Sequence, residues 1–323
     1  MGNTLTTEQA SVARKRNKNM GFSWKTYLKR YWTLYLLLVL PIAFFIVFRY
    51  TPMAYILLAF KKNNILQPPW QVAWAKNNGF EWFIKAFNDK NFLDALRNTI
   101  VLNLLDLIIG SPMPIIMAIL LNELAYPKFK RITQTVLYLP HFLSWVIISS
   151  ITLRLFATND GLINKAFGTA IPFVGTEGNW RATYIILGIW KECGWNTIIY
   201  LAALTAISPE LYEAAEVDGA GRLRKIWHVT LPGIRNTIAV MLILESGNIL
   251  SVSFNQIYIL INDAVLDTGE TLDYFVYRMG LSSANNFSVA TAVSLIKSIV
   301  GLGMILGTNL AARKLTDGEG GIW

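Results

Sequence analysis

The sequence predicts an all-α membrane protein with six transmembrane helices, and three observations lead to this prediction. Only 15% of the 323 residues are charged while 54% are apolar, whereas an average soluble domain is roughly 25% charged. Aromatic residues reach 13% and include eleven Trp, which suits a chain with aromatic belts at two interfaces. Six stretches are apolar over about 20 residues, the length that crosses the hydrocarbon core as a helix.

The six predicted spans follow one another along the chain. They lie at 32–49, 98–121, 134–156, 181–206, 236–261 and 287–311. The first is followed by RYTPMAYILLAF without a small-residue cleavage site, so an uncleaved span is expected rather than a signal peptide. This divides the chain into an interfacial N-terminal segment (1–31), a transmembrane domain (32–312) and a tail (313–323).

Lys and Arg are concentrated on one side of this topology. Seven lie in residues 1–31, and with the loops near 122–133 and 207–235 and the tail they amount to sixteen, against about seven on the opposite side. The excess predicts that both termini are cytoplasmic. The net charge of +9 gathers in the segments between apolar runs, a distribution that argues against nucleic-acid binding.

The sequence lacks the patterns of an enzyme or a metal protein. Cys193 is the single cysteine, and His141 and His228 are isolated from each other, so neither a disulfide framework nor a metal cluster is expected. The chain contains no G-x-x-x-x-G-K-[ST], H-E-x-x-H or G-x-S-x-G pattern. We therefore expect no catalysis and no ATP binding by this chain itself.

The segment 207–235, ISPELYEAAEVDGAGRLRKIWHVTLPGIR, is unusually rich for this chain in charged residues and in the Gly and Pro residues that interrupt helices. Ser208 is a suitable helix cap, Pro209 suits a first turn and Gly219 ends the helix. Pro232 then bends or restarts a second helix. The pattern predicts a helix–turn–helix on the cytoplasmic membrane surface that docks a partner. From these residues alone, a loop that merely returns the chain to the membrane remains the alternative.

The spacing in this segment resembles the EAA loop of importer-type ABC transporter permeases. That pattern runs E-A-A, three residues, Gly, nine residues, Ile-x-Leu-Pro, and this chain has EAA at 213–215, Gly219 and VTLP at 229–232. The segments LPIAFFIVFRYTPM, LLNELAYPKFKRITQTVLYLPHFLSWVI and IWKECGWNTIIYLAAL and the terminal GIW resemble the polysaccharide/oligosaccharide branch of binding-protein-dependent sugar permeases. Residues 61–80 and 263–280 match that branch less well.

The resemblance implies a type I ABC importer permease fold and a set of partners. The expected partners are a second, similar permease (a heterodimer), two ATPase subunits that bind ATP and Mg, an extracytoplasmic sugar-binding protein and a saccharide. The membrane would be a bacterial plasma membrane, and this chain would carry no cofactor. The resemblance assigns coupling to the ATPase to Glu213, Ala214, Ala215, Asp218, Gly219, Leu231 and Pro232.

Charged and polar side chains within the predicted spans need a reason, because each charge costs a few kcal/mol in hydrocarbon. The charged residues concerned are Asp106, Arg154, Lys191, Glu192, Glu245 and Lys297. Sugars are recognised by hydrogen-bonding groups and aromatic faces, and related importers line their pathway with the fifth span. The candidates for pathway contacts are Glu245, Asn248, Ser251, Asn255, Trp145, Trp190, Lys191 and Glu192. A local pair between Lys191 and Glu192, and plain packing of the aromatic rings, are the structural alternatives.

Two other classes of function remain open from the residues alone. An ion-gradient-driven secondary carrier would use Asp106, Glu245 and Lys297 as coupling residues. An intramembrane scaffold or receptor is the third class. The small number of spans and the charged loop 207–235 favour the importer over the carrier, and the polar fifth span counts against a scaffold.

Overall fold

A computed structural model describes residues 24–64, 66–282 and 285–315, which form two compact units, 1–56 and 57–323. The described residues of the first unit are helical: α2 (Trp24–Phe45), a π-helical turn (Ile46–Tyr50) and α3 (Thr51–Met53). Residues 1–23 of the predicted N-terminal segment and 316–323 of the predicted tail lie outside the described residues.

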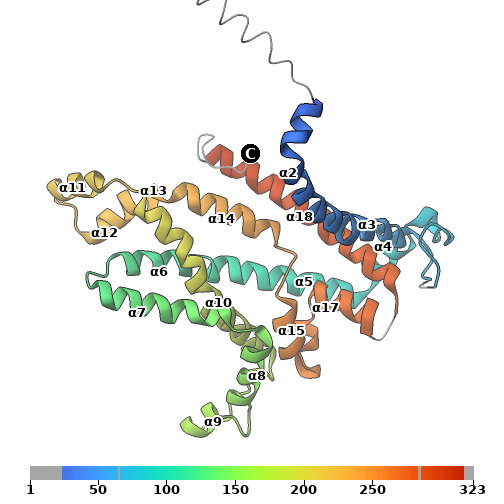
Figure 1. Cartoon of the computed structure of the whole chain (residues 1–323). Helices are drawn as coiled ribbons and strands as arrows, with labels where there is room; N and C mark the ends of the chain where they lie inside the picture. Colours follow the sequence, from blue (N-terminus) through green and yellow to red (C-terminus); the bar gives the residue numbers. More distant parts are fainter. Residues whose placement is uncertain (1–23, 65, 283–284, 316–323) are drawn as a thin grey trace, which may run out of the picture. The chain divides into compact units, whose positions relative to one another are not determined.

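The second unit is also helical, and its described residues contain no β-strand beyond an isolated bridge between Lys61 and Trp74. Its helices are α4 (Glu81–Asn88), α5 (Lys90–Leu105), α6 (Pro112–Asn122), α7 (Pro127–Tyr138), α8 (Trp145–Leu155), α9 (Leu162–Phe167), α10 (Glu177–Thr205), α11 (Pro209–Val217), α12 (Arg222–Lys225), α13 (Leu231–Gly233), α14 (Arg235–Gly247), α15 (Phe254–Leu260), α16 (Leu266–Gly269), α17 (Leu272–Tyr277) and α18 (Phe287–Leu315). In this unit α10 packs along α6, and α14 along α18 (Figure 1). The all-α prediction is confirmed.

The number of candidate spans differs from the predicted six. Three continuous helical stretches in the described chain are long and apolar enough to cross a membrane: Tyr27–Phe60, Lys90–Asn122 and Phe287–Ala311. Two bent helix pairs, Pro127–Leu155 and Arg222–Gly247, raise the number to five. The predicted fourth span falls on α10, which has 29 residues and is long enough. Its polar middle, WKECGWN, makes it less apolar than the others.

The third predicted span, 134–156, is not one straight helix. The chain bends by 96° between the stretch ending at Phe142 and α8. Pro140 lacks the N–H that would continue the helix, Leu143 is extended, and Ser144 caps α8 by accepting a hydrogen bond from the Ile147 N–H at 3.3 Å. The sequence LPHFLS therefore breaks the span that its hydropathy predicts.

The fifth predicted span, 236–261, is wrong as a continuous helix. Helix α14 ends at Gly247, residues 248–253 are not helical, and α15 begins at Phe254. Gly247 lies against Ile305 of α18, where an added Cβ would be 2.4 Å from Ile305 Cγ1. The following run NILSVS is rich in side chains that compete for backbone hydrogen bonds and so disfavour helix continuation. The bent pair that includes α14 instead begins at Arg222 and turns by 61° near Ile234.

Three of the π-helical turns precede a proline by two residues. They are Ile46–Tyr50 before Pro52, Asp106–Gly110 before Pro112, and Ile226–Thr230 before Pro232. A proline ring clashes with the carbonyl four residues earlier, and the wider turn moves that carbonyl away. In each case the residue before the proline donates its N–H to the carbonyl five residues back. The prolines thus produce local widening within otherwise helical stretches.

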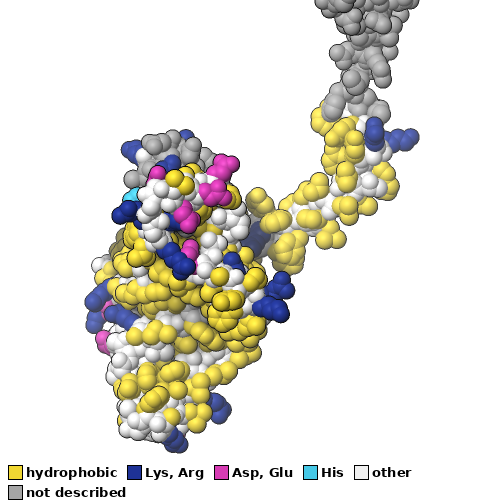
Figure 2. Space-filling model, turned by 90° about the vertical axis from the view of Figure 1, so that its left-hand side faces the viewer, with side chains coloured by type: hydrophobic (Ala, Val, Ile, Leu, Met, Phe, Trp, Pro, Cys, Tyr) yellow, Lys and Arg dark blue, Asp and Glu magenta, His cyan; other side chains and the backbone are white. Residues whose placement is uncertain are grey.

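Buried side chains in the second unit form three clusters. One joins α4, α5, α17 and α18 around Phe92 and Phe275, and a second joins α5, α10 and α15 around Trp180. The third joins α6, α10 and Ile234. Many large apolar side chains remain exposed, including Ile186, Leu302 and Leu310, as expected of a lipid-facing surface. Figure 2 shows hydrophobic side chains over much of one face of this unit, and charged ones gathered at the end that carries α11 and α12.

Candidate functional site

The loop between α10 and α14 is shaped by its own sequence. The Ser208 side chain caps α11 by accepting a hydrogen bond from the Glu210 N–H at 3.3 Å, and Pro209 occupies the first turn. Gly219 follows α11 with φ +74°, and an added Cβ would meet no atom within 4 Å. Glycine is therefore required at this position for its left-handed backbone and not for lack of space.

Two side-chain contacts hold α11 against the helical stretch that follows. Tyr212 Oη and Thr230 Oγ1 are 3.1 Å apart, and Lys225 Nζ donates to Glu216 Oε2 at 2.8 Å. The hydrogen bond from Lys225 lowers the pKa of the Glu216 carboxyl below its usual value. The helix–turn–helix predicted from the sequence is present, and these contacts make it a single folded element.

The residues that the resemblance assigned to coupling do not all lie together. Glu213, Ala214, Asp218 and Gly219 are exposed on or just after α11, and Ala215 is half-buried beside them. Leu231 and Pro232 lie instead in α13, at the far end of the second helical stretch. The exposed surface also carries four apolar side chains that are not among the residues assigned to coupling, namely Leu211, Val217, Leu223 and Trp227.

The connection from this loop to α14 passes through a buried pivot. Ile234, between α13 and α14, is 1% exposed and packs in the cluster with Ala118, Tyr200 and Leu204. Gly233 lies against the Ile207 side chain, since an added Cβ would be 2.6 Å from Ile207 Cδ1. The direction of α14 is thus fixed where the loop leaves the surface.

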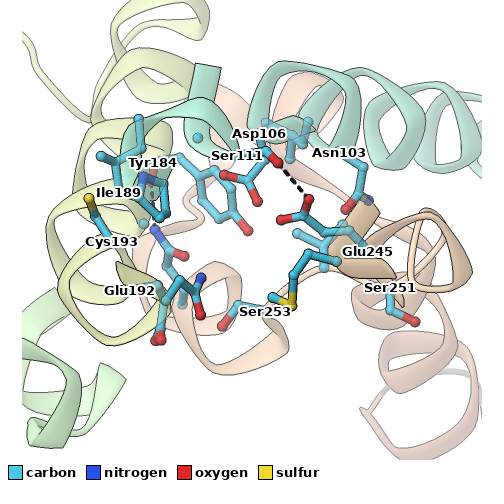
Figure 3. A pocket seen from close by; sticks show the side chains of 18 of the residues that line it. Asn103, Asp106, Ser111, Tyr184, Ile189, Glu192, Cys193, Glu245, Ser251 and Ser253 are labelled. Atoms are coloured by element: carbon cyan, nitrogen blue, oxygen red, sulfur yellow. Dashed lines mark hydrogen bonds between the residues drawn. The ribbon is translucent and has the colours of Figure 1, made fainter. Parts of the chain in front are cut away.

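A cavity of about 210 Å³ lies farther along α14, between α5, α6, α8, α10 and the non-helical stretch after α14 (Figure 3). It is lined by Leu102, Asn103, Asp106, Gly110, Ser111, Pro114, Trp145, Tyr184, Gly188, Ile189, Glu192, Cys193, Asn196, Tyr200, Met241, Glu245, Ser251, Val252, Ser253 and Gln256. Most of these side chains are polar or aromatic, a composition typical of a site for a polar ligand and unusual for helix packing within a membrane.

Three carboxyl groups reach this cavity from three helical segments (Figure 3). Glu245 of α14 accepts a hydrogen bond from Ser111 Oγ at 2.8 Å. Glu192 of α10 lies 2.7 Å from His141 Nδ1 and 3.3 Å from Lys191 Nζ. Asp106 stands in the π-helical turn after α5.

The predicted pathway residues divide into two groups. Trp145, Glu192, Glu245 and Ser251 line the cavity. The other four predicted residues, Asn248, Asn255, Trp190 and Lys191, are not among its lining residues. The first three of these are exposed, whereas Lys191 is buried and donates to the His141 carbonyl at 2.5 Å. The local pair of Lys191 with Glu192, which the sequence left open, is present.

Sequence reasoning missed most of the wall contributed by α10. Tyr184, Gly188, Glu192, Asn196 and Tyr200 line the cavity at a spacing of four residues, which places them along one face of a helix. This stripe is visible in the sequence as polar or small residues within an apolar run. Asp106 was recognised as a charged intramembrane residue but was assigned to the carrier alternative and not to a pathway.

Residues 110–316 match the family model described as "Binding-protein-dependent transport system inner membrane component". The chain belongs to this family. It is 43% identical to Protein LplB of Bacillus subtilis (strain 168), with 93% of this chain and 94% of that one covered. It is 41% identical to the polygalacturonan/rhamnogalacturonan transport system permease protein YteP of the same organism, with 97% and 96% covered.

A solved structure supports the same assignment. A bacterial alginate ABC transporter in complex with an alginate pentasaccharide-bound periplasmic protein contains a chain 35% identical to this one, with a TM-score of 0.81. The comparison covers 91% of this chain and 98% of that chain. The predicted type I ABC permease fold is confirmed.

Membership in the binding-protein-dependent family settles the class of function. The chain is a membrane permease subunit of an ABC transporter and is not itself an enzyme. Such a permease works with a second permease, ATPase subunits and a binding protein. The alternatives of an ion-gradient-driven carrier and of a scaffold are therefore removed.

Proposed function

We propose that the chain forms half of the translocation pathway of a bacterial importer for oligosaccharides or polysaccharide fragments. The names of YteP and of the alginate transporter support a saccharide substrate. The cavity supports it independently, because it combines hydrogen-bonding side chains such as Asn103 and Asn196 with the ring of Trp145. Ligand sites of this kind pair a few polar groups with apolar and aromatic walls.

The observation that carries the mechanism is the physical continuity between the loop and the cavity. Helix α11 is tied to the stretch 222–230 by the Tyr212–Thr230 and Glu216–Lys225 contacts. That stretch continues through the pivot at Ile234 into α14. Helix α14 contributes Glu245 to the cavity wall. A displacement of α11 by an ATPase subunit therefore moves a wall of the pathway as a rigid body.

The transporter has one orientation in the plasma membrane, and its subunits have separate roles. Both chain termini and the loop 207–235 face the cytoplasm, consistent with the excess of Lys and Arg on that side. ATP and Mg bind to the partner ATPase subunits, and this chain carries no cofactor. Its exposed Glu213 and Ala214 and half-buried Ala215 contact the ATPase surface, while Asp218 and Gly219 shape the turn and Leu231 and Pro232 transmit the displacement to α14.

The pathway assignment follows the cavity. Of the residues selected from the sequence, Trp145, Glu192, Glu245 and Ser251 are the proposed substrate contacts. Asn248, Asn255 and Trp190 are exposed and are proposed to face the second permease, which we take to be a different, homologous chain. Lys191 is proposed to hold the α7–α8 bend in place through the His141 carbonyl.

The experiment that tests this function is purification of the tagged chain with its partners, followed by saccharide uptake in proteoliposomes. Glu213→Ala removes the exposed charge, and Gly219→Pro is incompatible with φ +74°. We expect both variants to lose the ATPase subunit or to uncouple ATP hydrolysis from uptake. Glu123→Ala is the matched control, because Glu123 is another exposed acid predicted on the cytoplasmic side. Full uptake by both loop variants, or a wild-type chain that purifies without an ATPase subunit, would contradict the proposal.

A further inference from the structure

The cavity has an unbalanced charge. Asp106, Glu192 and Glu245 line it, and no Lys, Arg or His occurs among the described residues that do so. The carboxyl groups of these three residues therefore share one space (Figure 3). Charged groups in a membrane domain usually stand opposite a partner of the other sign, so the excess of acidic groups around this space needs an explanation.

Four cationic side chains of this unit are engaged by other groups. Lys191 donates to the His141 carbonyl and pairs with Glu192, and Arg181 Nη2 donates to Asn98 Oδ1 at 3.2 Å. Two further cations form ion pairs outside the cavity, namely Arg278 with Glu270 and Lys297 with Asp273. None of these four cations is among the residues that line the cavity, and the lining acid that Lys191 pairs with is Glu192.

The carboxylates of Asp106 and Glu245 are positioned by small neighbouring residues. An added Cβ on Gly110 would be 2.3 Å from Asp106 Oδ1, so a side chain at this position would displace the carboxylate. Ser111, the next residue, donates to Glu245 Oε2 at 2.8 Å. Gly110 and Ser111 therefore position acidic groups from two different helices toward the same space (Figure 3).

We propose that Asp106 and Glu245 determine specificity, and that they admit saccharides without acidic groups and exclude uronates. This inference rests on the proposed import of saccharides. Carboxylates accept hydrogen bonds from sugar hydroxyl groups, and such bonds to an ionised acceptor are stronger than neutral ones. A uronate instead adds a like charge in a poorly screened space, where repulsion at several ångströms amounts to about a factor of ten in affinity.

The proposed preference for uncharged saccharides differs from the substrates named for two similar proteins. One is a polygalacturonan/rhamnogalacturonan permease and another transports the acidic polysaccharide alginate. Both of these substrates contain uronic acids. High overall identity is compatible with a different substrate, because discrimination depends on the few groups that a ligand meets.

The test uses one saccharide skeleton with and without its charge. The probes are trigalacturonate and its fully methyl-esterified form, together with uncharged maltotriose, cellotriose and xylotriose. Uptake is measured in proteoliposomes that contain the complete transporter and its binding protein. Binding of the ester and the acid is also measured on the purified permease–ATPase complex without binding protein, which removes selection by that protein. Quenching of tryptophan fluorescence that disappears in Trp145→Phe assigns the binding to this cavity.

We expect the wild-type complex to bind the ester about tenfold more tightly than the acid. The double variant Asp106→Asn/Glu245→Gln should reduce this preference to about twofold, since Gln still accepts the bond from Ser111. Gly110→Ala, which displaces the Asp106 carboxylate, should reduce it partly. The control Glu177→Gln/Asp263→Asn changes two exposed acids outside the cavity and should leave the preference intact.

Two results would overturn the inference while leaving the proposed function standing. One is wild-type uptake of trigalacturonate as fast as that of the uncharged probes. The other is an ester preference that persists in the double variant. If an intact, ATP-hydrolysing complex takes up neither the charged nor the uncharged saccharides, the proposed saccharide import is refuted, and this inference with it.

Discussion

Gly219 in the coupling loop and Gly194 in α10 are both glycines at points where a side chain is not accommodated, but the reasons differ. Gly219 has open space around it and a backbone with φ +74°. Gly194 is in a regular helix, and an added Cβ would be 2.0 Å from the Leu137 carbonyl oxygen of α7. The loop is thus specified by local backbone conformation, whereas the region around the cavity is specified by close approach of distant helices.

The largest effect is expected where the α7 and α10 backbones meet. Gly194→Ala forces these helices apart, and overpacking of this kind costs about 3 kcal/mol. We expect a large loss of thermal stability of the purified chain in detergent, measured by unfolding followed on size-exclusion chromatography. Gly188→Ala is the matched control on the same helix, because an added Cβ at Gly188 meets nothing within 4 Å. Equal stability of the two variants would contradict the close approach.

The same distinction explains which features were predictable. Ser208, Pro209, Gly219 and Pro232 act on their immediate neighbours, so the loop and its helices could be predicted from short-range signals. The resemblance added the coupling role, which no contact within this chain would reveal. The acidic cavity depends on which faces of α5, α10 and α14 meet, and these helices are far apart in sequence.

The breaks in the third and fifth predicted spans show the limit of hydropathy. Pro140 and Ser144 are visible signals for a bend, but an apolar window averages over them. The end of α14 at Gly247 depends on contact with Ile305, 58 positions later in the chain. The sequence therefore places Asn248 and Asn255 on the same helix as Glu245, although Asn248 lies in the non-helical stretch after α14 and Asn255 in α15, and of the three only Glu245 lines the cavity.

A smaller effect is expected in the loop. Gly219→Ala places a Cβ in left-handed backbone, which costs about 1 kcal/mol. Because an added Cβ meets no other atom, the loss should be confined to the loop and not reach the helices around the cavity. Hydrogen exchange should show faster exchange of α11 amides only. Gly219→Asn should cost less, since Asn tolerates this conformation. Increased exchange in α7 and α10 would show that the two regions are not independently specified.

The contact between Tyr212 and Thr230 is expected to contribute less to the stability of the loop than the glycine at position 219. A double-mutant cycle with Tyr212→Phe and Thr230→Val should give a coupling energy of about 0.5 kcal/mol, within the range for a single neutral hydrogen bond. If this contact transmits motion, either single variant should also reduce uptake per ATP hydrolysed more than it reduces ATP hydrolysis. Additive effects of the two substitutions would show that the hydroxyl groups do not act together.

The smallest expected effect is a pH dependence of the loop. The hydrogen bond from Lys225 lowers the pKa of Glu216 in the folded loop. The unfolded loop therefore binds the proton more readily, so the contact stabilises the loop above the unfolded pKa and is lost as the pH falls through the folded one. We expect the protection of α11 amides, corrected for intrinsic exchange, to fall between about pH 5 and pH 3. Glu216→Gln should remove that step while leaving the capping bond of Ser208 in place. A step of unchanged size in Glu216→Gln would assign it to another carboxyl group, and the salt bridge would then contribute nothing to holding α11 against the stretch that leads to the cavity.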